Sequence, residues 1–329
     1  MLDKKRIFLI TIILLEIFIV FYLLNNLLSK KYVPVITDIP KESIVYENIS
    51  NYGFKYFYEY SPNTFRISDS IFGTVIYSTN SDGLRERYNY TKNKPDNTFR
   101  IAIFGDSFVY GQNVNISDVF TELLEDDLNL LNCSKKIEVI NFGVGGYEIP
   151  YMVESFIRKG RDYEPDISIF LIKHDDVYLI NELWSPILQK TMAEAGNPSW
   201  EKDFLKYVNT LNNALKEYFN KYSDYNKTIW YQNSIDIPFK RLKESNFKNS
   251  KIIIFSLLHD NEDEEHLKNK SKEYGFMFVS PNNLGSVDEF KKFWDKELSF
   301  TDAHPNKRGH RFLANFLYVY LVSNNLIEC

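Results

Sequence analysis

From Phe99 onwards, short continuous apolar runs alternate with longer amphipathic stretches. The runs are FRIAIF (99–104), IEVINF (137–142), DISIFLI (166–172) and KIIIFSLL (251–258), with FMFVS (276–280) as a weaker fifth. Helical patterns occupy about 117–130, a stretch ending near Lys159, and about 307–323. Continuous apolar strands alternating with helices are typical of a parallel sheet that is covered on both faces. We therefore predict an α/β domain over residues 99–329.

Two regions depart from this alternation. Residues 31–98 are rich in Tyr, Asn, Ser and Thr, with short strand patterns at 54–60 and 74–78. They predict a linker and a small β-rich preface. Residues 177–247 have a helical pattern with several Trp and Tyr, and we interpret them as an insertion between the third and fourth strands. Such an insertion can cover an active site or simply add packing, and both interpretations stay open.

The N-terminus holds the most apolar segment, residues 7–28. Its length suffices to cross a bilayer as a helix. Basic residues at 4–6 precede it and favour a cytoplasmic N-terminus with an exported domain, although the lysines at 30–31 reduce the bias. A cleaved signal peptide is the alternative, but the run is long for one and no small-x-small cleavage site follows. We predict a single-pass signal anchor over residues 1–30, with the domain on the extracytoplasmic side of the cell membrane.

Composition narrows the class of protein. The 329 residues carry a net charge of −5 with mixed signs along the chain, which is typical of a solvated surface rather than of a nucleic-acid binder. Cys133 and Cys329 are the two cysteines. We expect them to be unpaired thiols, with pairing outside the cell as the alternative. The sequence has no Cys/His cluster, P-loop or GxGxxG motif, so we expect no metal and no cofactor.

Polar and small residues collect where the predicted strands end. In parallel sheets, functional residues lie at the carboxyl ends of the strands. The residues in question are Gly105, Asp106 and Ser107 after the first run, Gly143, Gly145 and Gly146 after the second, His174, Asp175 and Asp176 after the third, and His259 and Asp260 after the fourth.

Ser107 stands in a predicted tight turn between a strand and a helix, where a side chain is exposed and backbone N–H groups lie beside it. Taken alone, a serine at this place is more often a helix cap than a nucleophile. Asp302 and His304 change that interpretation, because an Asp and a His two residues apart in a loop can present both side chains to one site. Serine hydrolysis needs a histidine base that is oriented by a carboxylate.

Taken together, these blocks resemble those of the SGNH hydrolase family. The matching segments are GDSF (105–108), NFGVGGY (141–147) and DAHPN (302–306), with NSDGLR (80–85) similar to the lead-in of membrane-anchored members. The resemblance covers about residues 75–175 and 298–325. It implies a three-layer α/β/α, flavodoxin-like fold in which Ser107 is the nucleophile, His304 the general base and Asp302 its orienting carboxylate.

The resemblance also implies an oxyanion hole made by the N–H groups of Ser107 and Gly146, with Gly143 and Gly145 as alternatives to Gly146. One block departs from the family pattern. The family usually has Gly-x-Asn-Asp, and its Asn is the third donor, whereas this chain has Lys-His-Asp-Asp at 173–176. Asp175 falls at the Asn position, and an ionised Asp has no hydrogen to donate.

His174 is the other candidate for that missing donor, and His259 is a candidate substrate contact. The sequence thus predicts a membrane-anchored serine esterase, or an enzyme that hydrolyses or transfers an O-acyl group, with acetyl favoured. Its expected substrate is an acylated glycan or lipid at the cell surface. A non-catalytic surface binding protein on the same scaffold is the alternative, and the altered third block motivates it.

Overall fold

The computed structural model describes residues 43–47 and 56–328, apart from 132, 200–201, 225, 247–249 and 285–286. Within this part of the chain, no helix is both long and apolar enough to span a membrane. The predicted anchor, residues 7–28, lies outside the described residues, and its prediction stays untested.

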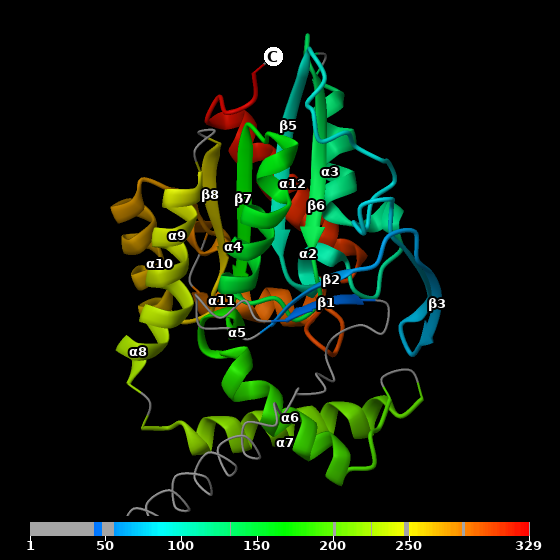
Figure 1. Cartoon of the computed structure of the whole chain (residues 1–329), viewed down its shortest axis with the longest axis vertical. Helices are drawn as coiled ribbons and strands as arrows, with labels where there is room; N and C mark the ends of the chain where they lie inside the picture. The colour runs from blue at the N-terminus through cyan, green and yellow to red at the C-terminus, as the bar shows by residue number, and fades with distance from the viewer. Residues whose placement is uncertain are drawn as a thin grey trace, which may run out of the picture. The chain divides into compact units, whose positions relative to one another are not determined.

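Five parallel strands form the central sheet, in the order β6-β5-β7-β8-β9 (Figure 1). They are β5 (Thr98–Gly105), β6 (Lys136–Gly143), β7 (Ile167–Lys173), β8 (Lys251–Leu257) and β9 (Met277–Val279). Counted along the chain from β5, this is the 2-1-3-4-5 order of flavodoxin-like sheets, which bind ligands where the order reverses. The reversal lies between β5 and β7, and all five predicted strands are confirmed.

Helices cover both faces of the sheet, because the strands are apolar on both sides. Every residue of β5 is buried, as are all but the first of β6. One face packs on α4 (Ile149–Arg158), α9 (Ile237–Ser245) and α10 (Asn261–Tyr274), and the other on α3 (Phe120–Asn129), α11 (Val287–Phe293) and α12 (Lys307–Ser323). The three-layer α/β/α prediction is therefore confirmed.

The residues inserted after β7 are mainly helical. They form α5 (Asp175–Tyr178), α6 (Asn181–Glu194), α7 (Phe204–Lys221), α8 (Lys227–Tyr231) and then α9, which a π-helical turn at Gln232–Asp236 precedes. Tyr218 on α7 is buried and donates a hydrogen bond of 2.6 Å to the backbone oxygen of Tyr178. This bond ties the inserted helices to the short helix that follows β7.

Four short strands precede the sheet. β1 (Ser43–Glu47) pairs with β2 (Tyr56–Tyr60), and β3 (Phe65–Ser70) pairs with β4 (Gly73–Ser78), both antiparallel. The Tyr58 hydroxyl donates to the Gly145 carbonyl at 2.9 Å, and the Tyr147 hydroxyl donates to the Tyr58 carbonyl. β2 therefore packs directly on the glycine loop after β6.

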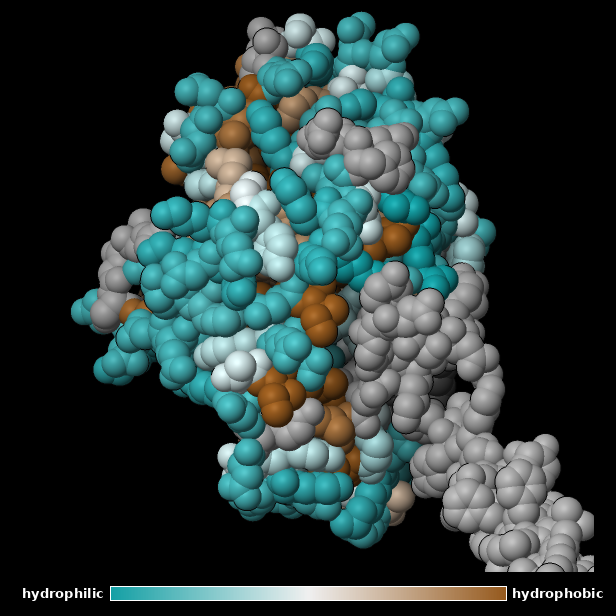
Figure 2. All heavy atoms as spheres, turned by 60° about the vertical axis from the view of Figure 1, so that its left-hand side comes forward, coloured by the Kyte–Doolittle hydropathy of each residue, from teal (hydrophilic) through white to brown (hydrophobic). Residues whose placement is uncertain are grey.

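The surface agrees with the mixed charges of the sequence. Figure 2 shows one face on which hydrophilic side chains predominate and apolar ones gather in small groups. The cysteine expectation needs a correction, because Cys133 is disulfide-bonded and is not a free thiol. The only other cysteine in the sequence is Cys329, which lies outside the described residues.

Candidate active site

Ser107 is the first residue of α2 (Ser107–Tyr110), directly after β5. The turn into this helix needs a glycine at position 105, since a Cβ there would overlap the Val109 side chain. Asp106 caps the helix by accepting a hydrogen bond of 2.8 Å from the backbone N–H of Phe108. The strand end thus presents a partly exposed serine at the point where the strand order reverses.

Two side chains from the far end of the sequence meet this serine. His304 Nε2 lies 2.9 Å from Ser107 Oγ, and His304 Nδ1 lies 2.8 Å from Asp302 Oδ2. Ser107, His304 and Asp302 form one hydrogen-bonded chain. An ionised Asp only accepts hydrogen bonds, so Asp302 favours the tautomer with a proton on Nδ1. That tautomer leaves Nε2 unprotonated and able to accept the Ser107 proton.

A tight loop places both of these side chains at the site. Ala303, between them, has φ +68°, a left-handed conformation that costs a non-glycine residue energy and that collects at functional sites. Hydrogen bonds from Phe300 N to the His304 carbonyl (2.8 Å) and from Ala303 N to the Phe300 carbonyl (3.0 Å) close the loop. Trp294 Nε1 donates to the Ala303 carbonyl at 3.4 Å. The strained backbone is therefore held on two sides.

Asn113 is a site residue that the sequence did not reveal. Its Nδ2 donates to Asp302 Oδ2 at 2.8 Å, and its own N–H donates to the Tyr77 hydroxyl at 2.9 Å. Asp302 therefore accepts hydrogen bonds from both His304 and Asn113. A loop asparagine has no pattern that marks it, and only the fold shows that it orients the carboxylate.

Arg85 holds the loop that carries Asn113. Its guanidinium is buried and donates to the carbonyls of Tyr110 (2.9 Å), Gly111 and Val114 (2.6 Å). It also lies over the Tyr77 and Tyr110 rings, at 4.5 and 5.0 Å from their centroids. The carbonyl and ring contacts offset the cost of burying this charge.

The three glycines after β6 differ in what their N–H groups do. The Gly143 N–H donates to Asn141 Oδ1 at 2.8 Å, and the Gly145 N–H donates to the Tyr60 hydroxyl at 3.4 Å. Gly146 is exposed with φ +79°, and its N–H has no acceptor among the residues that the structure describes. The same holds for the Ser107 N–H. These two N–H groups are thus available to a substrate oxygen.

At the third predicted donor position, Asp175 contacts the ammonium of Lys173. Removal from solvent acts to raise the pKa of the Asp175 carboxyl, but the Lys173 ammonium outweighs this and lowers it below its ordinary value. Asp175 is therefore an anion at neutral pH and donates no hydrogen bond. His174 is exposed, with its ring 5.3 Å from the Tyr178 ring, and its role as a donor stays a prediction.

The remaining histidines lie apart from the Ser107 chain of hydrogen bonds. His259 follows β8 and packs against Phe290, and burial lowers its pKa to about 4. Its Nδ1 is buried without a partner in the described part of the chain, so its role as a substrate contact stays a prediction. His310 is buried on α12 and accepts from the Phe120 N–H at 3.3 Å. No group of three or more His, Cys, Asp or Glu residues within the described ranges could hold a metal ion.

Comparisons with known proteins give similarity at the level of structure only. No protein-family model matches the chain, and no curated protein matches it significantly. A two-domain esterase active on acetylated mannans is 13% identical with a TM-score of 0.42, covering 70% of this chain and 50% of its own. TesA is 10% identical (TM-score 0.42, 69% of this chain and 99% of its own). Esterase EstA from Pseudoalteromonas sp. is 14% identical (TM-score 0.42, 70% and 100%).

The chain thus spans about half the length of the mannan esterase, and 48% of a gut microbial diltiazem-metabolizing enzyme that it also resembles. Likeness at this level carries no functional argument. Any functional assignment depends on the contacts within this chain.

Proposed function

We propose that the protein is a serine esterase or acyl-transfer enzyme of the SGNH hydrolase type. The observation that carries this proposal is the chain of hydrogen bonds from Ser107 through His304 to Asp302, at the reversal of strand order. A serine that only caps a helix does not require a histidine nitrogen 2.9 Å from its hydroxyl. A histidine that only packs in the core does not require a buried carboxylate at Nδ1. The combination is the arrangement that activates a serine hydroxyl.

In the proposed reaction, Ser107 Oγ attacks the ester carbonyl carbon while its proton passes to His304 Nε2. Asp302 stabilises the imidazolium that results, and the N–H groups of Ser107 and Gly146 stabilise the oxyanion. Collapse of the tetrahedral intermediate expels the alcohol, which takes the proton from His304 and leaves an acyl group on Ser107. Water or a sugar hydroxyl then attacks the acyl carbon and gives its proton to His304. The bond to Ser107 Oγ breaks, His304 returns the proton to Ser107, and the acid or the transferred ester is released.

The proposal includes a location and a substrate class. Residues 7–28 would anchor the domain outside the cytoplasm, and a disulfide-bonded Cys133 supports this because disulfides persist in oxidising compartments. A domain held there has glycan and lipid esters within reach. An acetyl ester on such a molecule is the proposed substrate. No described residue distinguishes hydrolysis from transfer, which differ in whether the site excludes water.

A second candidate is a surface binding protein on the same scaffold. The observation in its favour is the Asp175 anion at the third donor position, since an anion would repel a developing oxyanion. Binding alone, however, requires neither the left-handed Ala303 nor the hydrogen bonds that Asp302 accepts. Catalysis accounts for these features, and we favour it.

The test is hydrolysis of p-nitrophenyl acetate by the full chain in detergent, beside Ser107→Ala. Loss of the nucleophile should lower kcat roughly 10⁴-fold or more, with an unchanged melting temperature. Wild-type protein should also retain an acetyl group on Ser107 in a rapid acid quench, detected by mass spectrometry. Equal rates for the two proteins would refute Ser107 as the nucleophile and favour the binding protein, which a glycan-binding assay would then test.

A further inference from the structure

Lys173, the last residue of β7, lies among three carboxyl groups at the catalytic edge of the sheet. Its Nζ is 3.1 Å from Asp106 Oδ2, contacts Asp175, and lies 3.6 Å from Asp176 Oδ1. The side chain is only 13% exposed and passes beside the Phe108 ring, whose centroid is 5.7 Å from Nζ. A lysine so enclosed is fixed in place more firmly than a surface lysine.

The Lys173 ammonium lies close to the proposed nucleophile, Ser107. Asp106 Oδ2, which contacts Nζ, is also 3.3 Å from Ser107 Oγ. A single carboxylate oxygen therefore separates the ammonium from the serine hydroxyl. Lys173 ends β7 and Ser107 follows β5, and these two strands are neighbours in the sheet.

The Lys173 ammonium holds the carboxylates of Asp106 and Asp175 at the same time. Burial acts to lower the pKa of Lys173, but the carboxylates of Asp106 and Asp175 outweigh it and raise that pKa well above its ordinary value. Burial raises the pKa of the Asp176 carboxyl well above its ordinary value. Lys173 thus offsets the negative charge of Asp175, which alone would repel a nearby oxyanion.

The ammonium also has a hydrogen left to donate. It carries three N–H bonds. Asp106 and Asp175 lie within hydrogen-bonding distance of Nζ, whereas 3.6 Å to Asp176 is too long for a hydrogen bond. One N–H therefore remains without an acceptor among the residues that the structure describes.

We propose that the Lys173 ammonium completes the oxyanion hole, donating with the N–H groups of Ser107 and Gly146 to the substrate oxygen that becomes negative. Asp175 anchors the ammonium and cancels its charge while the site is empty. A charged donor stabilises an oxyanion both by a hydrogen bond and by its charge. The Lys173 ammonium can therefore take the place of the neutral Asn amide that the family pattern has at position 175. This inference rests on the proposed esterase function and adds a specific donor to it.

Hydrolysis by full-length Lys173→Met, Asp175→Asn and the double variant tests the assignment. Lys173→Met should lower kcat about 10²- to 10³-fold with KM within about threefold, because the donor acts on the transition state. The double variant should recover to within about tenfold of wild type, since the Asn amide can donate and the Asp175 anion is gone, while Asp106 keeps its hydrogen bond from the Phe108 N–H. Asp175→Asn alone should keep most of the activity.

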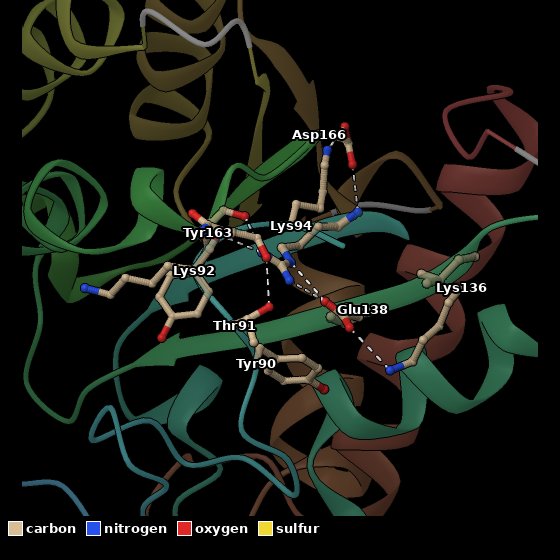
Figure 3. Close-up of polar contacts among 12 residues, drawn as sticks. Tyr90, Thr91, Lys92, Lys94, Lys136, Glu138, Tyr163 and Asp166 are labelled. Carbon is tan, nitrogen blue, oxygen red and sulfur yellow. Dashed lines mark hydrogen bonds and ion pairs between the residues drawn. The ribbon is translucent and has the colours of Figure 1, made fainter. Parts of the chain in front are cut away.

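Lys94→Met is the matched control. Lys94 is also a partly buried lysine, paired with Asp166 at 2.6 Å, but it lies at the opposite edge of the sheet (Figure 3). Its loss should leave kcat unchanged. A thionoester substrate gives a second readout, because sulfur accepts hydrogen bonds more weakly than oxygen. Lys173→Met should cost at least about tenfold less on the thionoester than on the matched oxygen ester.

Every result of these experiments either supports or contradicts the donor role of Lys173. An equal loss on both esters, a raised KM alone, or no loss in Lys173→Met would overturn the donor role while leaving the esterase function standing. Absence of Ser107-dependent turnover in the wild type would overturn both. If Lys173→Met fails to fold, the double variants with Asp175→Asn and Asp175→Leu carry the test, since both lack the anion. The Asn form should be about 10²-fold faster, and equal rates would refute the proposal.

Discussion

The sheet has an amino edge, where its parallel strands begin, and a carboxyl edge, where they end. Both edges carry charged and polar residues, but these residues have different roles at the two edges. At the amino edge, Arg100 donates to Glu138 at 2.7 and 3.0 Å and to the Tyr163 carbonyl at 2.6 Å. Asp166 accepts from Lys94 at 2.6 Å and from the Arg100 N–H at 2.8 Å. Figure 3 shows Lys94 beside Asp166 and Lys136 beside Glu138 in this group of polar contacts. Their hydrogen bonds tie neighbouring strands together.

At the carboxyl edge, the polar groups are arranged around atoms that have no partner in the described chain. The N–H groups of Ser107 and Gly146 face no internal acceptor, and Ala303 and Asn113 both have left-handed backbone. A hollow of about 290 Å³ lies at the amino edge, bounded by Lys94 and Asp166 among others. The paired charges at the amino edge stabilise the fold. Strained backbone and unpaired donors, such as those at the carboxyl edge, are typical of an active site.

The largest loss of stability should come from removing the Arg100–Glu138 ion pair at the amino edge. Arg100→Met removes the buried partner of the Glu138 carboxylate and leaves it only the exposed Lys136 at 3.3 Å, which should cost about 3 kcal/mol of unfolding free energy. Urea denaturation measures this loss. The folded fraction should keep its kcat, and Arg100→Met combined with Glu138→Leu should regain much of the stability. A fall in kcat per folded molecule would contradict the division between the two edges.

The next effect is a pH dependence that originates near the carboxyl edge. Burial, assisted by the nearby Arg85 charge, lowers the pKa of His310 to about 3, below the ordinary value of about 6.5. The unfolded chain therefore binds a proton that the folded chain does not, and stability is lost as pH falls from about 6.5 towards 3. Between pH 7 and pH 4 this loss should be on the order of 3 kcal/mol.

His310→Gln removes this titration while keeping an acceptor for the Phe120 N–H. Denaturation curves from pH 7 to pH 4 should show a shallower loss of stability in the variant than in the wild type. Parallel curves for the two proteins would mean that other groups account for the acid sensitivity.

Much of the sheet was predictable because parallel strands are buried on both faces and so appear as continuous apolar runs. The short strands predicted at 54–60 and 74–78 correspond to β2 and β4, whereas β3 was not predicted. In β3, Phe65 and Ile67 are exposed while the following Ser68 is buried. That pattern is the reverse of a half-buried strand. Residue Cys133 was misjudged because the only other cysteine stands at the last position, where the sequence gives no reason to expect a fixed partner.

The candidate site was predictable only where a residue stands at a strand end or in a recognisable block. Ser107, His304 and Asp302 satisfied that condition and are brought together. Asn113 did not, because its contact with Asp302 spans 189 positions and depends on the folded loop. Lys173 was noticed only as a departure from a family pattern. Its meaning depends on three carboxyl groups that the fold places around it.

Asn113→Ala tests whether Asn113 orients Asp302 at the carboxyl edge. Asp302 would lose the hydrogen bond from Asn113 and keep only those from His304, so His304 would be less firmly oriented. We expect kcat to fall about 10- to 100-fold, or about 1.4–2.7 kcal/mol of transition-state stabilisation, with KM little changed. Asn113→Asp is the harsher comparison, because it places a second carboxylate against Asp302. An unchanged kcat in Asn113→Ala would remove Asn113 from the proposed machinery.

The smallest effect should come from Lys94→Met at the amino edge. The ion pair with Asp166 is partly exposed, with side-chain exposures of 22% and 31%, so its loss should cost no more than about 1 kcal/mol. Asp166 keeps its hydrogen bond from the Arg100 N–H, which limits the damage further. Urea midpoints and kcat measured together check this. Because the same substitution at Lys173 should lower kcat with little change in KM, a kcat loss in Lys94→Met would show that position along the sheet does not separate stability from activity in this protein.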